Sequence, residues 1–405
     1  MPHRVYPPEK SDTEILHDLM GEVHAFLPLL EREEIRNFLQ ALKRDAEEEL
    51  EEIKAFTLRE EALLSAIPQE DEYGALLRIH EELNALEMER FLAFFSVPAL
   101  HENCTSYRDA LAGRALELVR AGLPEPPPLP FALISMGSDG REEQTLITDQ
   151  DYLIVHGDGG SDEADRYFEE LSRILVERLS EIGFKKCTGG IMPCNEKWRG
   201  SLSQWQRRLL AIVRYEVEDY GKNVMDLIVI SDARFVAGDR ELADELVLRI
   251  RALEQDYFQA LWGMAKAATE MKLALGFLKR FWTEGCGEHK GEFNLKLLAW
   301  APLVMNVRIL AINQGIPATS TVKRIAYLER EGSFSPETAR GLIEAYRILT
   351  KHRILLQIKV IKGIQDDAYY LNPYSLPREE RERMRHALLL IEDLQKIIHT
   401  NFSIM

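Results

Sequence analysis

The chain has 405 residues, of which 46% are hydrophobic and 29% are charged, which is the composition of an ordinary folded protein. A chain of this length can form two or three domains, each with its own core. The net charge of −17 argues against a protein that wraps a nucleic-acid backbone, because such binding depends on neutralising phosphates.

Neither the N-terminus nor the cysteines indicate export. The first ten residues, MPHRVYPPEK, have no apolar run behind their charges, so we expect no signal peptide. The most apolar stretch, residues 296–308, is interrupted by Pro302 and is shorter than the roughly 20 residues that a membrane helix needs. The scattered cysteines are typical of reduced thiols: Cys104, Cys187, Cys194 and Cys286. We therefore expect a cytoplasmic protein without membrane contact.

The N-terminal part is predicted to be helical. Apolar residues recur at helical spacing from Ile15 onward, and this pattern persists until Ala121-Gly122. The proline cluster from Pro124 to Pro130 then forms a stiff connector. These features predict an N-terminal helical domain over residues 1–125.

After the proline cluster, short β-rich segments alternate with helical ones. This alternation indicates an α/β core, which we place at residues 126–240. We predict strands at 131–136, 151–155 and 223–231 and a helix at 163–182.

From about Glu241 the helical spacing returns and continues to the end of the chain. Residues 241–405 are therefore predicted to form a C-terminal helical bundle. The expected fold class is α+β and mostly helical, with a small central α/β sheet domain between N-terminal helices and this bundle.

The stretch from Gly137 to Val155, GSDGREEQTLITDQDYLIV, combines a tight turn with an acidic pair. A glycine at a strand end lets the backbone approach a ligand, and the following N–H groups and the Ser138 hydroxyl can bind phosphates. Asp149 and Asp151 are two residues apart, so on a strand they would share a face about 6–7 Å from each other. Such carboxylates repel each other unless a cation binds, which predicts Mg²⁺, or Mn²⁺ as an alternative, with substrate phosphates completing the shell.

A third carboxylate is expected from a neighbouring strand. Asp226 and Asp232 both lie in or just after NVMDLIVIS, and their numbers have the same parity, so either could face the acidic pair. The residues alone leave both candidates open.

Several cations could reach a triphosphate, although ordinary salt bridges would explain the same residues. Arg141 lies in the spacer between the turn and the acidic pair, where a short helix is expected. Lys197 and Arg199 follow the flexible pair Gly189-Gly190. Further candidates in the helical C-terminal part are Lys279, Lys296 and Arg308.

These motifs resemble the nucleotidyltransferase superfamily of DNA polymerase beta type, whose signature is Gly-Ser followed by Asp-x-Asp. More narrowly, the chain resembles a nucleotidyltransferase family related to the uridylyltransferase that modifies nitrogen-regulatory PII proteins. That family reads GSxGRxEQTxxTDQDN where this chain has GSDGREEQTLITDQDY, with Tyr152 in place of the usual Asn. The similarity extends over roughly residues 75–400, and aligning SDARFVAGD places Asp232 at the third acidic position.

The resemblance implies a sheet of nucleotidyltransferase type in the central domain and a Mg²⁺-dependent enzyme. It would transfer a nucleoside monophosphate from an NTP to a hydroxyl on a protein acceptor and release pyrophosphate. Asp149, Asp151 and Asp232 would be catalytic and hold the metal ions. The residues expected to bind the nucleotide are Gly137, Ser138, Arg141, Lys197 and Arg199.

Two other functions fit parts of the pattern. A nucleotide-sensing module would bind NTP and transfer nothing. An RNA-tailing polymerase would suit the catalytic motif but not the acidic net charge. A homo-oligomer is compatible with the sequence, which does not specify the assembly.

Overall fold

The structure is a computed structural model that describes residues 32–159 and 161–404. The start of the predicted N-terminal helical pattern, from Ile15, lies outside the described residues. The chain divides into two compact units, Met1–Gln69 and Glu70–Met405. In the first unit, helix α2 (Glu33–Ala66) is followed by a 3₁₀ turn, η2 (Ile67–Gln69). The second unit contains the sheet and the candidate site.

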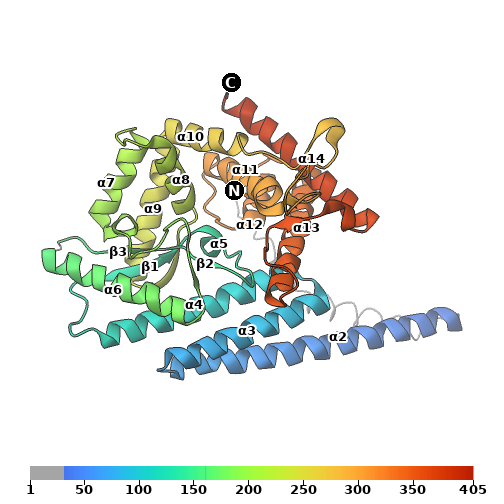
Figure 1. Cartoon of the computed structure of the whole chain (residues 1–405), viewed down its shortest axis with the longest axis horizontal. Helices are drawn as coiled ribbons and strands as arrows, with labels where there is room; N and C mark the ends of the chain where they lie inside the picture. The colour runs from blue at the N-terminus through green and yellow to red at the C-terminus, as the bar shows by residue number, and fades with distance from the viewer. Residues whose placement is uncertain (1–31, 160, 405) are drawn as a thin grey trace, which may run out of the picture. The chain divides into compact units, whose positions relative to one another are not determined.

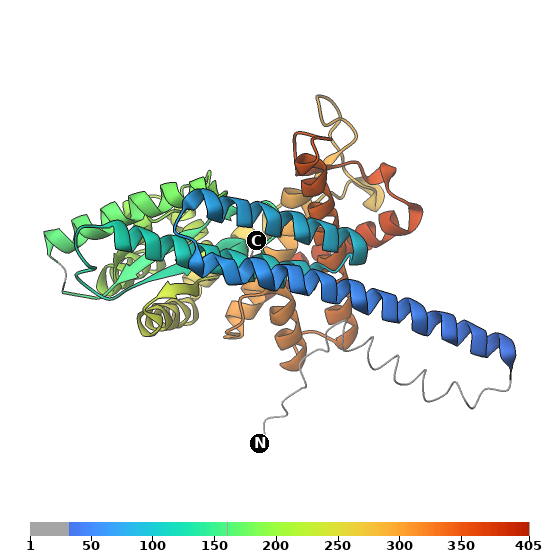
Figure 2. The same ribbon diagram turned by 90° about the horizontal axis from the view of Figure 1, so that it is seen from below.

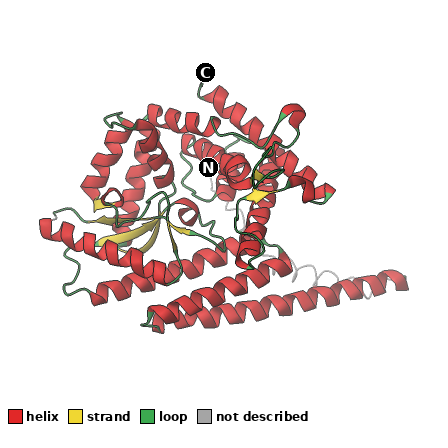
Figure 3. Ribbon diagram, in the orientation of Figure 1, coloured by secondary structure: helices red, strands yellow, loops and turns green. Residues whose placement is uncertain are grey.

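The predicted α+β, mostly helical fold is confirmed. Helices make up 67% of the structure and surround a small mixed sheet, as Figure 3 shows. The strand order in the sheet is β5-β3-β1-β6, with β1 antiparallel to both of its neighbours and β3 parallel to β5. The bounds are β1 (Phe131–Ser135), β3 (Tyr152–His156), β5 (Arg199–Ser201) and β6 (Arg234–Gly238).

The two central strands are buried at every residue. Their sequences, FALIS and YLIVH, are accordingly apolar along most of their length and do not alternate with polar residues, as expected where both faces of a sheet are covered. The strands predicted at 131–136 and 151–155 are confirmed as β1 and β3.

Helices cover both faces of the sheet (Figure 1). One face carries α4 (Val97–Gly122) and α6 (Asp162–Glu181), the latter confirming the helix predicted at 163–182. The other face carries α7 (Leu202–Val213) and α9 (Arg240–Asp256). Figure 2 shows α3 (Tyr73–Phe94) lying beside α4, against which it packs.

The strand predicted at 223–231 is wrong, because this segment forms helix α8 (Tyr220–Ile230). Asp219 begins the helix by accepting a hydrogen bond from the backbone N–H of Lys222, 3.0 Å away. A short apolar run such as VMDLIVI fits a buried helix as well as a buried strand, so its periodicity could not distinguish the two. The place beside β1 is taken by the next segment, β6.

The C-terminal region is a helical bundle, as predicted, with one small exception. Strand β7 (Phe293–Asn294) pairs with β8 (Tyr370–Leu371) at its edge. A π-helical turn, η5 (Lys296–Trp300), follows β7 and continues directly into α11. The main helices are α10 (Phe258–Thr269), α11 (Ala301–Asn313), α12 (Thr321–Arg330), α13 (Pro336–Ile361) and α14 (Arg378–Asn401).

The interruption expected at Pro302 does not occur. Pro302 lies in the first turn of α11, where a missing N–H is tolerated, and the helical stretch runs from Lys296 to Asn313. Within the described part of the chain, this is the one stretch whose length and composition alone would allow it to cross a membrane, but 72% of it is buried inside the protein. Core helices have the same character.

Candidate functional site

The turn after β1 places a glycine against a carboxylate. Gly137 begins the short helix α5 (Gly137–Gly140) with a φ of +59°, and a β-carbon at this position would lie 2.6 Å from Asp151 Oδ2. A side chain here would therefore strain the backbone and displace the acid. Gly140 is equally restricted, because its β-carbon would lie 2.0 Å from the carbonyl oxygen of Asp232.

The acidic pair lies immediately beside this turn. Asp149 belongs to strand β2 (Asp149–Gln150), which pairs with β4 (Lys185–Lys186), and Asp151 lies between β2 and β3. The carbonyl of Asp151 accepts a hydrogen bond of 2.8 Å from the N–H of Met136, which joins the pair to the end of β1. The turn and the two acids are thus held at one end of the central strands.

Asp151 carries an unsatisfied charge. Its Oδ1 is buried without a hydrogen-bond partner in the described structure. Burial raises the pKa of Asp151 to about 6; the thiol of Cys187 lowers it by hydrogen bonding, while the nearby carboxylates of Asp149 and Asp139 raise it further. A bound cation would remove both the repulsion and the unmet hydrogen-bonding capacity, so the pair fits a hard metal such as Mg²⁺.

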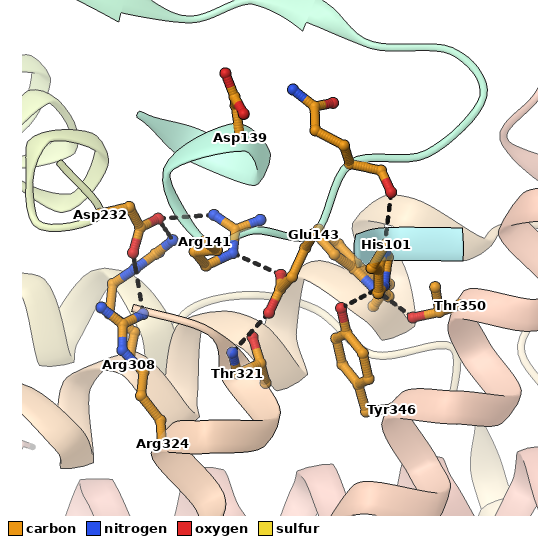
Figure 4. A network of polar contacts seen from close by, with 12 residues as sticks. His101, Asp139, Arg141, Glu143, Asp232, Arg308, Thr321, Arg324, Tyr346 and Thr350 are labelled. Atoms are coloured by element: carbon orange, nitrogen blue, oxygen red, sulfur yellow. Dashed lines mark hydrogen bonds and ion pairs between the residues drawn. The ribbon is translucent and has the colours of Figure 1, made fainter. Parts of the chain in front are cut away.

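Asp232 has a different environment from the one predicted for it. It lies between α8 and β6, is fully buried, and binds three arginines (Figure 4). The Asp232 carboxylate accepts hydrogen bonds from Arg141 at 2.7 Å, from Arg324 at 3.0 Å, and from Arg308. Burial alone would raise the pKa of Asp232, but Arg308, Arg141 and Arg324 together lower it to about 2.

These arginines leave no oxygen of Asp232 open to a metal ion. The alternative, Asp226, lies on α8 and forms an ion pair with Lys197. Among the residues that the structure describes, no group of three or more His, Cys, Asp or Glu side chains is arranged to hold a metal. Any metal would therefore depend on Asp149, Asp151 and ligands from the substrate.

Arg141 connects the turn to the bundle. It donates to Asp232 and, at 2.7 Å, to Glu143, whose other oxygen accepts the N–H of Thr321 at the start of α12. The carbonyl of Gln144 accepts from Nδ1 of His101, so the other ring nitrogen accepts from the Tyr346 hydroxyl of α13. The spacer after Gly140 is thus irregular, where a short helix was expected, and is fixed by contacts to α4, α12 and α13.

Most of the other predicted cations are engaged elsewhere. Lys197 pairs with Asp226, and Arg199 donates to the carbonyls of Pro193 and Cys194, at 3.2 and 2.9 Å. Lys279 pairs with Glu392 on α14, and Arg308 with Asp232.

Lys296 is the exception among these candidates. Burial and Arg353 lower the pKa of Lys296, while Asp149 and Asp151 raise it, so its ammonium group interacts electrostatically with the acidic pair. Arg353 of α13, whose charge acts on Lys296, was not among the predicted cations, because a single arginine in a long helix has no local signature.

If Asp232 anchors the arginines, its removal should destabilise the fold. We expect Asp232→Asn to lower the free energy of unfolding by about 3 kcal/mol or more, because three buried cations lose their counter-charge. Urea denaturation would measure this. Asp226→Asn, which breaks a partly exposed pair, is the matched control and should cost less than about 1 kcal/mol. Unchanged stability in Asp232→Asn together with weaker Mg²⁺ binding would instead support a metal ligand.

Glu254 of α9 predicts a pH dependence of stability. Burial raises the pKa of its carboxyl to about 8, although Arg324 opposes the shift, from an ordinary value of 4.5. The folded state therefore retains a proton that the unfolded chain releases, and stability falls as the pH rises from 4.5 through about 8.

Replacing this group should remove the effect. We expect Glu254→Gln to match the wild type near pH 4.5 and to exceed it by more than about 1 kcal/mol at pH 9, as measured by denaturant unfolding across this range. A difference that does not vary with pH would contradict the assignment.

Two family models match the chain. Residues 81–219 match the model described as "Putative nucleotidyltransferase DUF294", and residues 258–402 match "Putative nucleotidyltransferase substrate binding domain". No curated protein matches the chain. The first match contains the glycine turn and the acidic pair, and the second contains Lys296 and Arg353. The chain therefore belongs to the family that these two models describe.

Proposed function

We propose that the protein transfers a nucleoside monophosphate from an NTP to a hydroxyl group and releases pyrophosphate. The observation that carries this proposal is the Asp149–Asp151 pair, with a buried, unpartnered carboxylate oxygen beside the Gly137 turn. A buried carboxylate oxygen that folding leaves without a partner is costly, which is typical of a site completed by a ligand.

Asp149 and Asp151 would hold Mg²⁺, or Mn²⁺ as an alternative. The bound ion would neutralise phosphate charge and acidify the acceptor hydroxyl. The first N–H groups of the turn at Gly137 and Ser138 have no acceptor within the helix and would bind phosphate oxygens. Arg141 would act indirectly, by fixing the turn to Asp232 and Glu143.

The acceptor we propose is a hydroxyl on a regulatory protein, by resemblance to the enzymes that modify PII proteins. The net charge of −17 disfavours a nucleic-acid acceptor. We propose that the protein acts in the cytoplasm without membrane contact, because its scattered cysteines are typical of reduced thiols and the membrane-length apolar stretch found in its described residues is 72% buried.

A second function is favoured by one specific observation. Because Asp232 is occupied by arginines, the site has two open carboxylates where the family signature implies three. A module that binds Mg²⁺ and NTP as a signal, without transfer, would need no more than two.

The acidic pair provides the test. In a cell lysate supplied with each labelled NTP in turn and Mg²⁺, we expect Asp149→Asn and Asp151→Asn each to reduce transfer of label at least about 100-fold, because phosphate charge is no longer neutralised. Asp393→Asn, on the exposed face of α14, is the matched control and should label like the wild type.

Two outcomes would change the proposal. Undiminished labelling by both variants would exclude these residues as metal ligands. Tight calorimetric binding of Mg²⁺ and NTP by the wild type, with no pyrophosphate released in any lysate, would favour the sensing module.

A further inference from the structure

Two cations of the bundle lack an anionic partner in the described part of the chain, and one of them, Lys296, interacts electrostatically with the acidic pair. Lys296 is the first residue of the π-helical turn η5, and Arg353 lies in α13. In the described residues, neither side chain has a hydrogen bond or an ion pair, and each lies over an aromatic ring instead. Lys296 Nζ is 5.3 Å from the centroid of Tyr369, and Arg353 Cζ is 3.9 Å from that of Trp300.

The charges around Arg353 do not supply a free anion. Burial lowers the pKa of Arg353 to about 10, although Tyr346 opposes the shift. Glu143 also attracts Arg353, but both of its oxygens are already bound, by Arg141 and by the N–H of Thr321. The buried cations Arg308 and Arg324 are paired with Asp232. Lys296 and Arg353 are instead partly exposed, so their charged groups are accessible to an anion from outside the chain.

Hydrogen bonds hold the ring of Trp300 and the backbone of Tyr369, the two aromatic residues that the cations contact. Trp300 Nε1 donates a hydrogen bond of 3.1 Å to the hydroxyl of Thr350, one turn before Arg353 on α13. The N–H of Leu295 donates to the carbonyl of Tyr369 at 2.8 Å, which continues the pairing of β7 with β8. Arg353 therefore lies over a ring that is fixed before any ligand binds, which lowers the entropic cost of binding.

The location of the pair restricts its ligand. Lys296 interacts electrostatically with Asp149 and with Asp151, the proposed metal ligands, and with Arg353. A polyphosphate bound between the acidic pair and these cations would contact a metal ion at Asp149 and Asp151 and the side chains of Lys296 and Arg353. The guanidinium of Arg353 suits two phosphate oxygens at once, and the ammonium of Lys296 suits a single concentrated charge.

We propose that Lys296 and Arg353 bind the β- and γ-phosphates of the NTP, which become the pyrophosphate product. This inference rests on the proposed function. In the reaction, the acceptor oxygen forms a bond to the α-phosphorus and its proton passes to water. The bond from that phosphorus to the bridging oxygen breaks, and pyrophosphate leaves with the electron pair. Lys296 and Arg353 stabilise the negative charge that accumulates on it.

Binding measurements with pyrophosphate and Mg²⁺ test the pair without requiring turnover. We expect Lys296→Gln and Arg353→Gln each to weaken binding of pyrophosphate and of NTP at least about tenfold, while binding of the corresponding NMP changes less than about twofold. Arg353→Lys, which keeps the charge but loses the fork, should give an intermediate loss. Lys396→Gln, on the exposed face of α14, is the control and should bind all three ligands like the wild type.

Lys296 is partly exposed, so Lys296→Gln keeps the test valid even if Arg353→Gln does not fold; thermal unfolding of each variant would show which is folded. Wild-type affinity for pyrophosphate in folded Lys296→Gln would overturn the inference, as would an equal loss for NTP and NMP. If label transfer is found but neither substitution changes pyrophosphate binding, the proposed role of Lys296 and Arg353 fails and the proposed transfer stands. If no transfer is found but pyrophosphate binding depends on them, the proposed transfer fails and the anion site stands.

Discussion

The buried carboxylate of Asp232 is the interaction on which the site depends. It lies between helix α8 and strand β6 and binds one arginine from the glycine turn and two from the helical bundle. A fully buried charge is tolerated only when its hydrogen-bonding capacity is met, so these partners cannot move independently. The glycine turn beside the sheet and the helical bundle are therefore fixed to each other through Asp232.

The charged groups named at the proposed site are of two kinds. Asp232, Glu143 and Arg141 are fully engaged with one another and with backbone groups, and their role is to hold the turn in position. Asp151, by contrast, has an oxygen without a partner, and Arg353 has only an aromatic ring. Because folding gains nothing from an unmet charge, the second group points to a ligand and the first does not.

The proposed site is therefore built from both halves of the unit. The sheet supplies two carboxylates and a glycine turn, which suit a metal and phosphate oxygens, and the bundle supplies Lys296 and Arg353. Both cations lie within residues 258–402, the part that matches a family model described as a substrate-binding domain. A nucleotide bound in this way would contact both halves, so the bundle would take part in binding as well as in support.

The local motifs were determined by the sequence itself. The apolar run of β1, the turn at Gly137 and the Asp149–Asp151 pair follow one another closely in the chain. Short-range sterics and residue type are therefore enough to predict a strand, a turn and two neighbouring carboxylates. The tertiary structure decided everything that depends on partners far apart in sequence. The apolar run NVMDLIVIS suits a helix or a strand, and its packing against α7 and α10 accompanies the helix. The carboxylate of Asp232 binds Arg308 and Arg324, which lie 76 and 92 residues further along the chain. Arg353 lies over Trp300 because α13 packs against η5, and no local sequence pattern predicts this long-range contact.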